Sequence, residues 1–254
     1  MILEEFDDNK KAVLNASDCI KKIDGFPKVA VSCFARSTFN RLLDSFEGRE
    51  IARTSIANME IPIYEVEYKG IKVALFNSYV GAAGCVAVIE DLFAMGLEKL
   101  VLFGTCGVLD KSIKDCSIVI PDRAVRDEGT SYHYMSACDE VKVNEGYIDI
   151  FKEFLKENGI TYSVGKAWTT DGIYRETRNK VNKRKAQGCI CVDMECSAVA
   201  ALAKFREKEI LYFFYAADNL DTEHWDPRSL SNYHNLEEKH RIAFLAMEMA
   251  IKMQ

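Results

Sequence analysis

Short apolar runs alternate along this chain with longer segments in which apolar residues recur every three or four positions. The first pattern is typical of buried strands, and the second of helices with one buried face. Strands are predicted over residues 28–34, 61–68, 71–76, 100–103, 116–120, 161–168, 189–192 and 210–217, and helices over 81–95, 147–158, 194–205 and 236–253. This alternation predicts an α/β fold, a three-layer α/β/α sandwich around a twisted mixed sheet.

Glycine and proline residues indicate how several of these elements end. Lys69 and Gly70 separate two strand-like runs and predict a hairpin. Pro121 has no N–H group for a strand ladder, so it is predicted to stop the strand before it. The strand over 100–103 is expected to break into a tight turn over 104–107, because that stretch contains two glycines.

Length and charge restrict the class of protein. The chain has 254 residues and no internal repeat, low-complexity tract or linker, which predicts one domain spanning residues 1–254. Its net charge of -6 argues against a nucleic-acid ligand, since such proteins need a basic surface. The longest run of small apolar residues, 81–89, is too short to span a membrane, and the polar amino end lacks the apolar core of a signal peptide.

The nine cysteines are scattered without the spacing of a disulfide framework. Cys189 and Cys191 are close together but lack the second pair that a structural zinc site needs. Reduced thiols are therefore expected, which predicts a cytoplasmic location. No metal or organic cofactor is expected, since the sequence has neither a ligand cluster nor a nucleotide-triphosphate phosphate loop.

Four polar segments lie at the carboxyl ends of predicted strands, over 32–36, 103–107, 192–195 and 216–219. In open α/β sheets ligands bind at these ends, because loops from several strands meet there. An acidic chain must bind an anion with focused arginines and backbone N–H groups, and the planar guanidinium of Arg36 matches phosphate.

The same segments resemble the nucleoside phosphorylase family. Residues 104–107 are similar to its Gly-Ser/Thr-Cys-Gly turn, 193–195 to its Glu-Met-Glu-Ala-Ala segment, and 217–218 to the Ser-Asp of its purine-specific members. Residues 170–174 resemble the family's Asp-x-Phe-Tyr stretch beside the base, and 81–84 its glycine-rich turn before a helix. The order of all five segments favours family membership more strongly than any one of them.

The resemblance implies roles for the phosphate and sugar sites. Arg36 and Thr105 correspond to phosphate-binding residues, and Arg53 to an arginine lent by a neighbouring subunit. Glu195 is expected to accept hydrogen bonds from the ribose hydroxyls, with Met194 packed against the sugar. The family is homo-oligomeric, so a dimer or a hexamer is expected, and inorganic phosphate would be a co-substrate.

At the base, the resemblance makes Asp218 the general acid that protonates the leaving purine, a role that needs a raised pKa. The expected base-binding residues are Cys106, Gly107, Tyr174, Arg178 and Asp193. A polar cluster that includes Trp225 follows and is hypothesised to cover the base, with His224 or Arg228 supporting Asp218.

Each of these features also has a purely structural interpretation. Asp193 and Glu195 are then charges at a helix N-terminus, where they complement the helix dipole. Asp218 would cap a turn, and Arg36 and Tyr174 would be a solvated arginine and a half-buried aromatic residue.

Departures from the family pattern leave three further functions open. Leu102 stands where phosphorylases have an arginine, which is also absent from the related nucleosidases that use water. Uridine phosphorylases bind the uracil edge just after the stretch that ends at Tyr174, and here Arg178 is similar in character but not in register. Ile173 replaces a stacking phenylalanine, so a nucleoside-binding protein without turnover is the remaining alternative.

Overall fold

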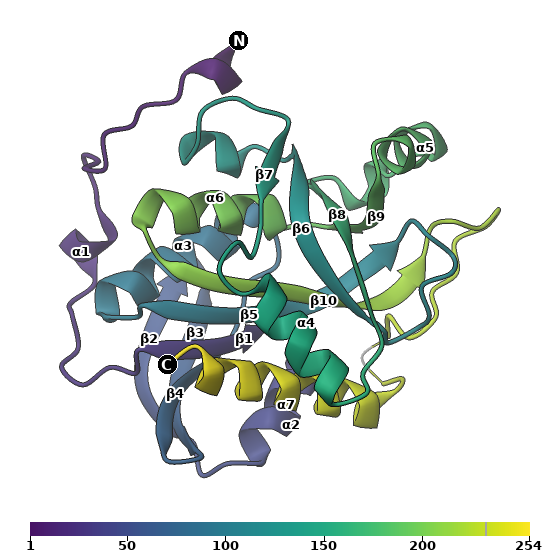
Figure 1. Cartoon of the computed structure of the whole chain (residues 1–254). Helices are drawn as coiled ribbons and strands as arrows, with labels where there is room; N and C mark the ends of the chain where they lie inside the picture. Colours follow the sequence, from purple (N-terminus) through teal and green to yellow (C-terminus); the bar gives the residue numbers. More distant parts are fainter. Residues whose placement is uncertain (232) are drawn as a thin grey trace.

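Ten strands form one mixed sheet within residues 1–231 and 233–254, the part of the chain that the computed structural model describes (Figure 1). The strands are β1 Val29–Cys33, β2 Arg49–Ile56, β3 Met59–Tyr68, β4 Ile71–Asn77, β5 Lys99–Val108, β6 Ile118–Asp127, β7 Glu140–Lys142, β8 Tyr162–Thr170, β9 Cys189–Asp193 and β10 Glu209–Asn219. The helices are α1 Ala16–Cys19, α2 Arg36–Asp44, α3 Ala82–Met95, α4 Ile148–Glu157, α5 Arg178–Ala186, α6 Cys196–Arg206 and α7 Leu236–Lys252, with short 3-10 turns η1 Ile2–Glu4, η2 Thr130–His133 and η3 Ile173–Arg175.

Part of the sheet closes on itself. The strand order is β10-β6-β8-β9-β5-β1-β4-β3-β2, and β10 pairs with β5 as well as with β6. Strands β5, β9, β8, β6 and β10 therefore form a ring, and the remaining strands extend from β5 as an open sheet. The hairpin of β3 and β4 turns at Lys69 and Gly70 as predicted.

Helices cover both faces of the sheet, which confirms the predicted α/β architecture. In Figure 1, α3 and α6 lie above β5 and β10, while α2 and α7 lie below them. Buried residues of β5 alternate between the two sides: Leu100 and Leu102 join the apolar cluster of α3 and α6, whereas Val101 and Phe103 join that of α4 and α7. No helix among the described residues is long and apolar enough to cross a membrane.

The predicted turn over 104–107 is wrong, because β5 continues through it and pairs with β10. The two glycines are needed for close packing instead of for a turn. A Cβ atom on Gly104 would lie 2.8 Å from the Phe34 ring, and one on Gly107 would lie 2.5 Å from Leu220 Cδ1. The two glycines therefore do have a structural role, which is to make room for neighbouring side chains beside a continuous strand.

The predicted strand end at Pro121 is also wrong. β6 continues to Asp127, and its pairing with β8 shifts register between Pro121 and Arg123. A bulge of this kind accommodates a residue without an N–H group. Among the helices and strands, α1, α2, α5, β2 and β7 were not predicted, and α2 starts at Arg36.

We expect Phe213→Ala to destabilise the fold strongly. The Phe213 ring is fully buried, and its centroid lies 5.5 Å from that of Phe103 and 4.8 Å from that of Phe151. Removing such a side chain leaves a cavity and costs about 3–5 kcal/mol. Urea unfolding followed by circular dichroism would show a lower midpoint, whereas Tyr233→Ala, at an 84% exposed residue, should leave it in place. Equal midpoints for Phe213→Ala and the wild type would contradict the packing described.

Candidate active site

The ends of β5, β9 and β10 meet at one cavity of about 200 Å³. Seven of the residues predicted for the site line it. They are Thr105, Cys106 and Gly107 of β5, Asp193, Met194 and Glu195 at the end of β9, and Asp218 of β10. Gly107 pairs with Val192 on one side and with Asp218 on the other, which explains why residues remote in sequence converge.

Asp193 holds the start of α6. Its Oδ2 accepts the backbone N–H groups of Glu195 (2.8 Å) and Cys196 (2.6 Å), and its Oδ1 accepts the Thr169 hydroxyl (2.7 Å). Asp193 therefore does have the structural role considered above, at the N-terminus of α6, and it also lines the cavity.

Glu195 is fixed at the cavity wall by two donors. The backbone N–H of Gly81 donates to Oε1 at 2.6 Å, and the Tyr212 hydroxyl donates to Oε2 at 3.4 Å. Gly81 precedes α3 with φ at 97°, a conformation that favours glycine. The predicted glycine-rich turn thus has a definite contact, because it aims a backbone N–H at the carboxylate.

Burial shifts the proton affinity of both carboxyls. Burial raises the pKa of Glu195, and the negative charge of Asp193 raises it further. Burial also raises the pKa of Asp193, although the hydrogen bonds from Thr169 and the α6 backbone oppose the change. When two carboxyl groups lie close together and away from water, burial and mutual repulsion favour the state in which at least one of them is protonated and neutral.

Asp218 is buried beside Gly107 and is bonded to the loop that follows it. The indole Nε1–H of Trp225 donates to Oδ2 at 2.8 Å, so neither residue hypothesised to support Asp218 makes this hydrogen bond. Burial raises the pKa of Asp218, while the Trp225 hydrogen bond and the Arg228 charge oppose the rise. Arg228 therefore acts on Asp218 through its charge.

The two predicted phosphate arginines lie outside this cavity. Arg36 is exposed and lines an adjoining cavity of about 640 Å³, which shares Phe34 and Val80 with the first. Arg53 lies on β2, where its guanidinium contacts the carboxylates of Glu50 and Glu60 at 2.8 Å. The structure thus brings Thr105, Glu195 and Asp218 together in one cavity. Arg36 lines the adjoining cavity, and Arg53 lies on β2, outside both.

The remaining predicted residues line a third cavity, of about 490 Å³, that shares Asp218 with the first. Tyr174 is 94% exposed, so it stacks on nothing within the described chain. The Arg178 guanidinium donates to the backbone carbonyls of Leu220 (2.8 Å) and Thr222 (2.6 Å) and so ties α5 to the loop after β10.

Glu176 was not among the predicted site residues, yet it lines both the first and the third cavity. Burial raises its pKa to about 7, with further contributions from the charges of Asp218 and Asp193. The only sequence signal was its place in the polar stretch after Tyr174, where an exposed loop acid looks the same.

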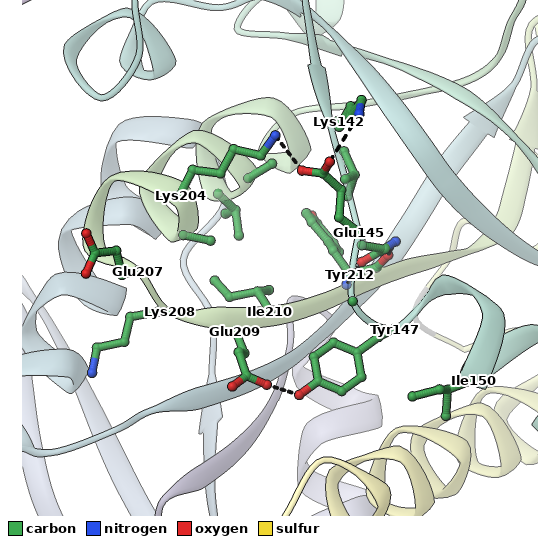
Figure 2. Close-up of a pocket in the computed structure, with 16 residues that line it drawn as sticks. Lys142, Glu145, Tyr147, Ile150, Lys204, Glu207, Lys208, Glu209, Ile210 and Tyr212 are labelled. Carbon is green, nitrogen blue, oxygen red and sulfur yellow. Dashed lines mark hydrogen bonds and ion pairs between the residues drawn. The ribbon is translucent and has the colours of Figure 1, made fainter.

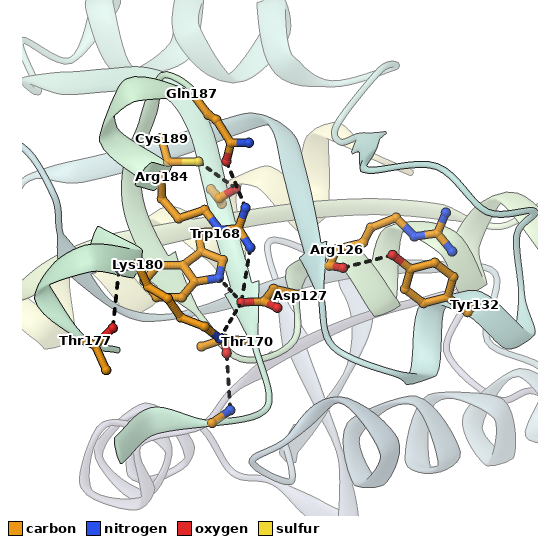
Figure 3. A network of polar contacts seen from close by, with 12 residues as sticks. Arg126, Asp127, Tyr132, Trp168, Thr170, Thr177, Lys180, Arg184, Gln187 and Cys189 are labelled. Atoms are coloured by element: carbon orange, nitrogen blue, oxygen red, sulfur yellow. Dashed lines mark hydrogen bonds and ion pairs between the residues drawn. The ribbon is translucent and has the colours of Figure 1, made fainter. Parts of the chain in front are cut away.

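A polar network anchors the helix that follows Glu176 (Figure 3). Asp127 accepts hydrogen bonds from Trp168 Nε1 (2.9 Å) and Lys180 Nζ (3.1 Å), and it pairs with Arg184 at 3.3 Å. Thr177 caps α5 by accepting the Lys180 backbone N–H. The start of α5 is therefore held against β6 and β8.

A separate cavity of about 510 Å³ lies between α6, α4 and the start of β10 (Figure 2). None of the residues predicted for the site lines it. Its rim is largely self-paired, since Glu145 binds Lys142 (3.3 Å) and Lys204 (2.7 Å). Tyr212 lines this cavity, and its hydroxyl donates to Glu195, which lines the cavity at the ends of β5, β9 and β10.

Comparison with known proteins defines the family. The model of the phosphorylase superfamily matches residues 28–247, so the chain belongs to that superfamily. It is 27% identical over 150 residues to a guanosine phosphorylase of Halorubrum lacusprofundi, which is 58% of this chain and 61% of the relative. The aligned part thus spans about three fifths of that relative.

Two solved structures share the fold. A uridine phosphorylase of Vibrio fischeri superposes with a TM-score of 0.76 at 18% identity, covering 96% of this chain and 99% of the other. A purine nucleoside phosphorylase of Toxoplasma gondii, in complex with immucillin-H, gives 0.72 at 17% identity, covering 94% and 96%. The family model thus confirms the family resemblance noted in the sequence, and the solved structures confirm the fold.

We expect Glu195→Gln to stabilise the protein at high pH. In the folded state the pKa of Glu195 lies above its unfolded value, so the fold loses stability as pH rises through that interval. A glutamine still accepts the Gly81 N–H but has no charge to bury. The melting temperature of the variant should exceed that of the wild type at about pH 8, and the difference should shrink towards about pH 5.

The exposed Glu153→Gln serves as the matched control and should show no such pH dependence. A constant difference between Glu195→Gln and the wild type across this range would be evidence against a buried, shifted carboxyl.

Proposed function

We propose that this chain is a nucleoside phosphorylase that cleaves the N-glycosidic bond of a purine nucleoside with inorganic phosphate, releasing the free base and ribose 1-phosphate. The observation that supports this most is the convergence of Thr105, Glu195 and Asp218 on one cavity. A hydroxyl for phosphate, a carboxyl group for the sugar and an acid for the base are then present in one space. The free thiols support a cytoplasmic enzyme.

Glu195 is assigned to the ribose. Its two oxygens already accept one donor each, and a carboxyl oxygen can accept a second. The two neighbouring hydroxyls of a ribose supply a matching pair of donors. Met194 lines the same cavity and offers an apolar surface to the sugar ring.

Asp218 is assigned to general acid catalysis. Burial raises its pKa, which increases the share of the protonated form that a general acid needs. As the bond to the base lengthens, negative charge accumulates on the purine and the sugar becomes oxocarbenium-like. Proton transfer from Asp218 to a purine nitrogen then neutralises the leaving group.

The phosphate is assigned to the side of the cavity at Thr105, towards Arg36. Phe34 and Val80 border both the site cavity and the Arg36 cavity, so the two spaces are neighbours. A phosphate held there is placed to attack the anomeric carbon opposite the base. Arg53 is assigned to the site of a neighbouring copy in a homo-oligomer, a dimer or a hexamer.

Hydrolysis by water is the second candidate, and the charge of the cavity favours it. Its described lining includes the acids Glu176, Asp193, Glu195 and Asp218 but no lysine or arginine. Leu102, which stands where phosphorylases have an arginine, is fully buried in an apolar cluster. Phosphate binding therefore depends on Arg36 and on groups outside the cavity, whereas a water molecule needs neither.

Phosphate dependence of inosine cleavage distinguishes the two reactions. If the chain is a phosphorylase, hypoxanthine release stops in phosphate-free buffer and ribose 1-phosphate is the product when phosphate is added. Arg36→Ala should raise the KM for phosphate, because a guanidinium–phosphate contact is lost. Equal rates with and without phosphate, with free ribose as product, would identify a nucleosidase instead.

Asp218→Asn should lower kcat on inosine by roughly 10²–10⁴-fold, since an amide has no proton to donate at this step. In the wild type, kcat should fall as pH rises through the raised pKa of Asp218, because the protonated form disappears. The matched control is Asp149→Asn on α4, a side chain 86% exposed, which should retain full activity. Full turnover by Asp218→Asn would refute the assignment of the acid.

A further inference from the structure

A chain of buried hydrogen bonds links the start of α6 to the loop after β6. Glu128 directly follows β6 and is only 5% exposed, and its Oε1 accepts the Ser197 hydroxyl at 2.8 Å. Its Oε2 accepts the backbone N–H of Ser131 at 2.9 Å. Within the described part of the chain, Glu128 does not line the site cavity itself. It is instead a buried acid in contact with the helix that begins directly after Glu195.

Ser197 is held by both of its polar groups. Its hydroxyl donates to Glu128, and its backbone N–H donates to Thr169 Oγ1 at 3.0 Å. The Thr169 hydroxyl in turn donates to Asp193, which accepts the backbone N–H of Glu195. Ser197 and Thr169 are both fully buried. Because Ser197 lies in the first turn of α6, these contacts fix the orientation of the turn that follows Glu195.

The other end of the chain of hydrogen bonds is anchored at η2. The buried Arg126 guanidinium donates from Nε to the Ser131 hydroxyl at 2.8 Å, and its other nitrogens donate to main-chain carbonyls later in the same loop. It also lies over the Tyr132 ring, 4.1 Å from the centroid (Figure 3). Ser131 is therefore held in place, and the network that includes Glu128 is anchored at both ends.

We propose that Glu128 is a positioning residue that orients Glu195 towards the ribose hydroxyls, acting through Ser197 and the first turn of α6. This inference rests on the proposed function and adds a residue to its sugar site. Glu195 must accept two ribose hydroxyls while it keeps its contacts with Gly81 and Tyr212. Its position therefore has little tolerance, and a misplacement of about 1 Å can cost about 10²-fold in rate.

The choice of a carboxyl group at residue 128 follows from the donors around it. The Ser131 N–H and the Ser197 hydroxyl both need an acceptor, and a carboxyl group supplies one oxygen to each. Alanine supplies none and leaves two buried donors unpaired. Glutamine supplies an oxygen for the Ser131 N–H, and its amide N–H can donate to the Ser197 hydroxyl oxygen. Glu128→Gln thus keeps both contacts by reversing one of them.

The test compares inosine with 2′,3′-dideoxyinosine, which lacks the hydroxyls that Glu195 is assigned to bind. We expect Glu128→Ala to lower the ratio of kcat/KM for inosine to that for 2′,3′-dideoxyinosine by roughly 10-fold, the effect of one weakened hydrogen bond. A general loss of folded protein or of phosphate binding lowers both values and leaves the ratio in place. Glu128→Gln should restore most of the wild-type ratio.

Two further variants control for the helix and for folding. Glu145→Ala is the matched control, because Glu145 binds Lys204 (2.7 Å) in the last turn of α6, at the end remote from Glu195. It should keep the wild-type ratio. Ser197→Ala removes only the hydroxyl that contacts Glu128, so it tests the same link if Glu128→Ala does not fold. It should lower the ratio in the same direction, with melting temperatures confirming that each variant is folded.

A double-mutant cycle shows whether Glu128 acts through Glu195. In the Glu195→Ala background, calorimetry should detect no further change in the relative binding of the two nucleosides when Glu128→Ala is added. An additional loss of the same size as in the wild-type background would overturn the inference, as would an unchanged ratio in folded Ser197→Ala and Glu128→Ala. The phosphorylase survives either result. If the wild type neither cleaves nor binds inosine, the proposed function fails and this inference fails with it.

Discussion

The pairing of β5 with β10 along most of its length and with β9 at its end holds the candidate active site together. Gly107 lies between Val192 and Asp218 in this register, so a shift of one residue would carry the acid to the other face of the sheet. The ring formed by β5, β9, β8, β6 and β10 gives each of these strands at least two neighbours, which fixes the register. The geometry of the cavity is therefore a property of the whole sheet.

The cavity concentrates acids that a folded protein would otherwise keep in water. Backbone N–H groups compensate for part of the cost, since α6 donates to Asp193 and Gly81 donates to Glu195. The remaining cost appears as raised pKa values of Glu195 and Asp218. A cluster of this kind is expected at a working site, where stability is commonly lower than a protein of the same fold could reach.

Buried strands and amphipathic helices could be predicted from the sequence because their pattern depends on which residues avoid water. The helix of α3 between Gly81 and Gly96 and the β3–β4 hairpin illustrate this. Glycines 104 and 107 misled the prediction, because crowding by Phe34 and Leu220 requires the same residue that a turn does. Sequence alone does not distinguish a glycine required by crowding from a glycine required by a turn.

The site was predictable where short motifs end strands, as at Glu195 and Asp218. Glu176 was not assigned, and Trp225 was expected to cover the base without contacting Asp218, because both placements depend on how α5 and the loop after β10 pack against the sheet. Contacts between segments far apart in the sequence leave no local pattern; Lys180 and Asp127 are 53 residues apart, and Arg178 and Leu220 are 42 apart. The placement of Arg36 next to the cavity likewise depends on where α2 begins.

The hydrogen bond from Trp225 to Asp218 has a stereochemical consequence. An indole N–H can only donate, so Oδ2 of Asp218 must remain an acceptor while the contact lasts. Because the carbonyl oxygen of a neutral carboxyl is a better acceptor than its hydroxyl oxygen, the contact favours a proton on Oδ1, the oxygen near the bare Cα of Gly107. One tryptophan thus biases which of the two oxygens carries the proton, and with it the direction in which the acid delivers that proton.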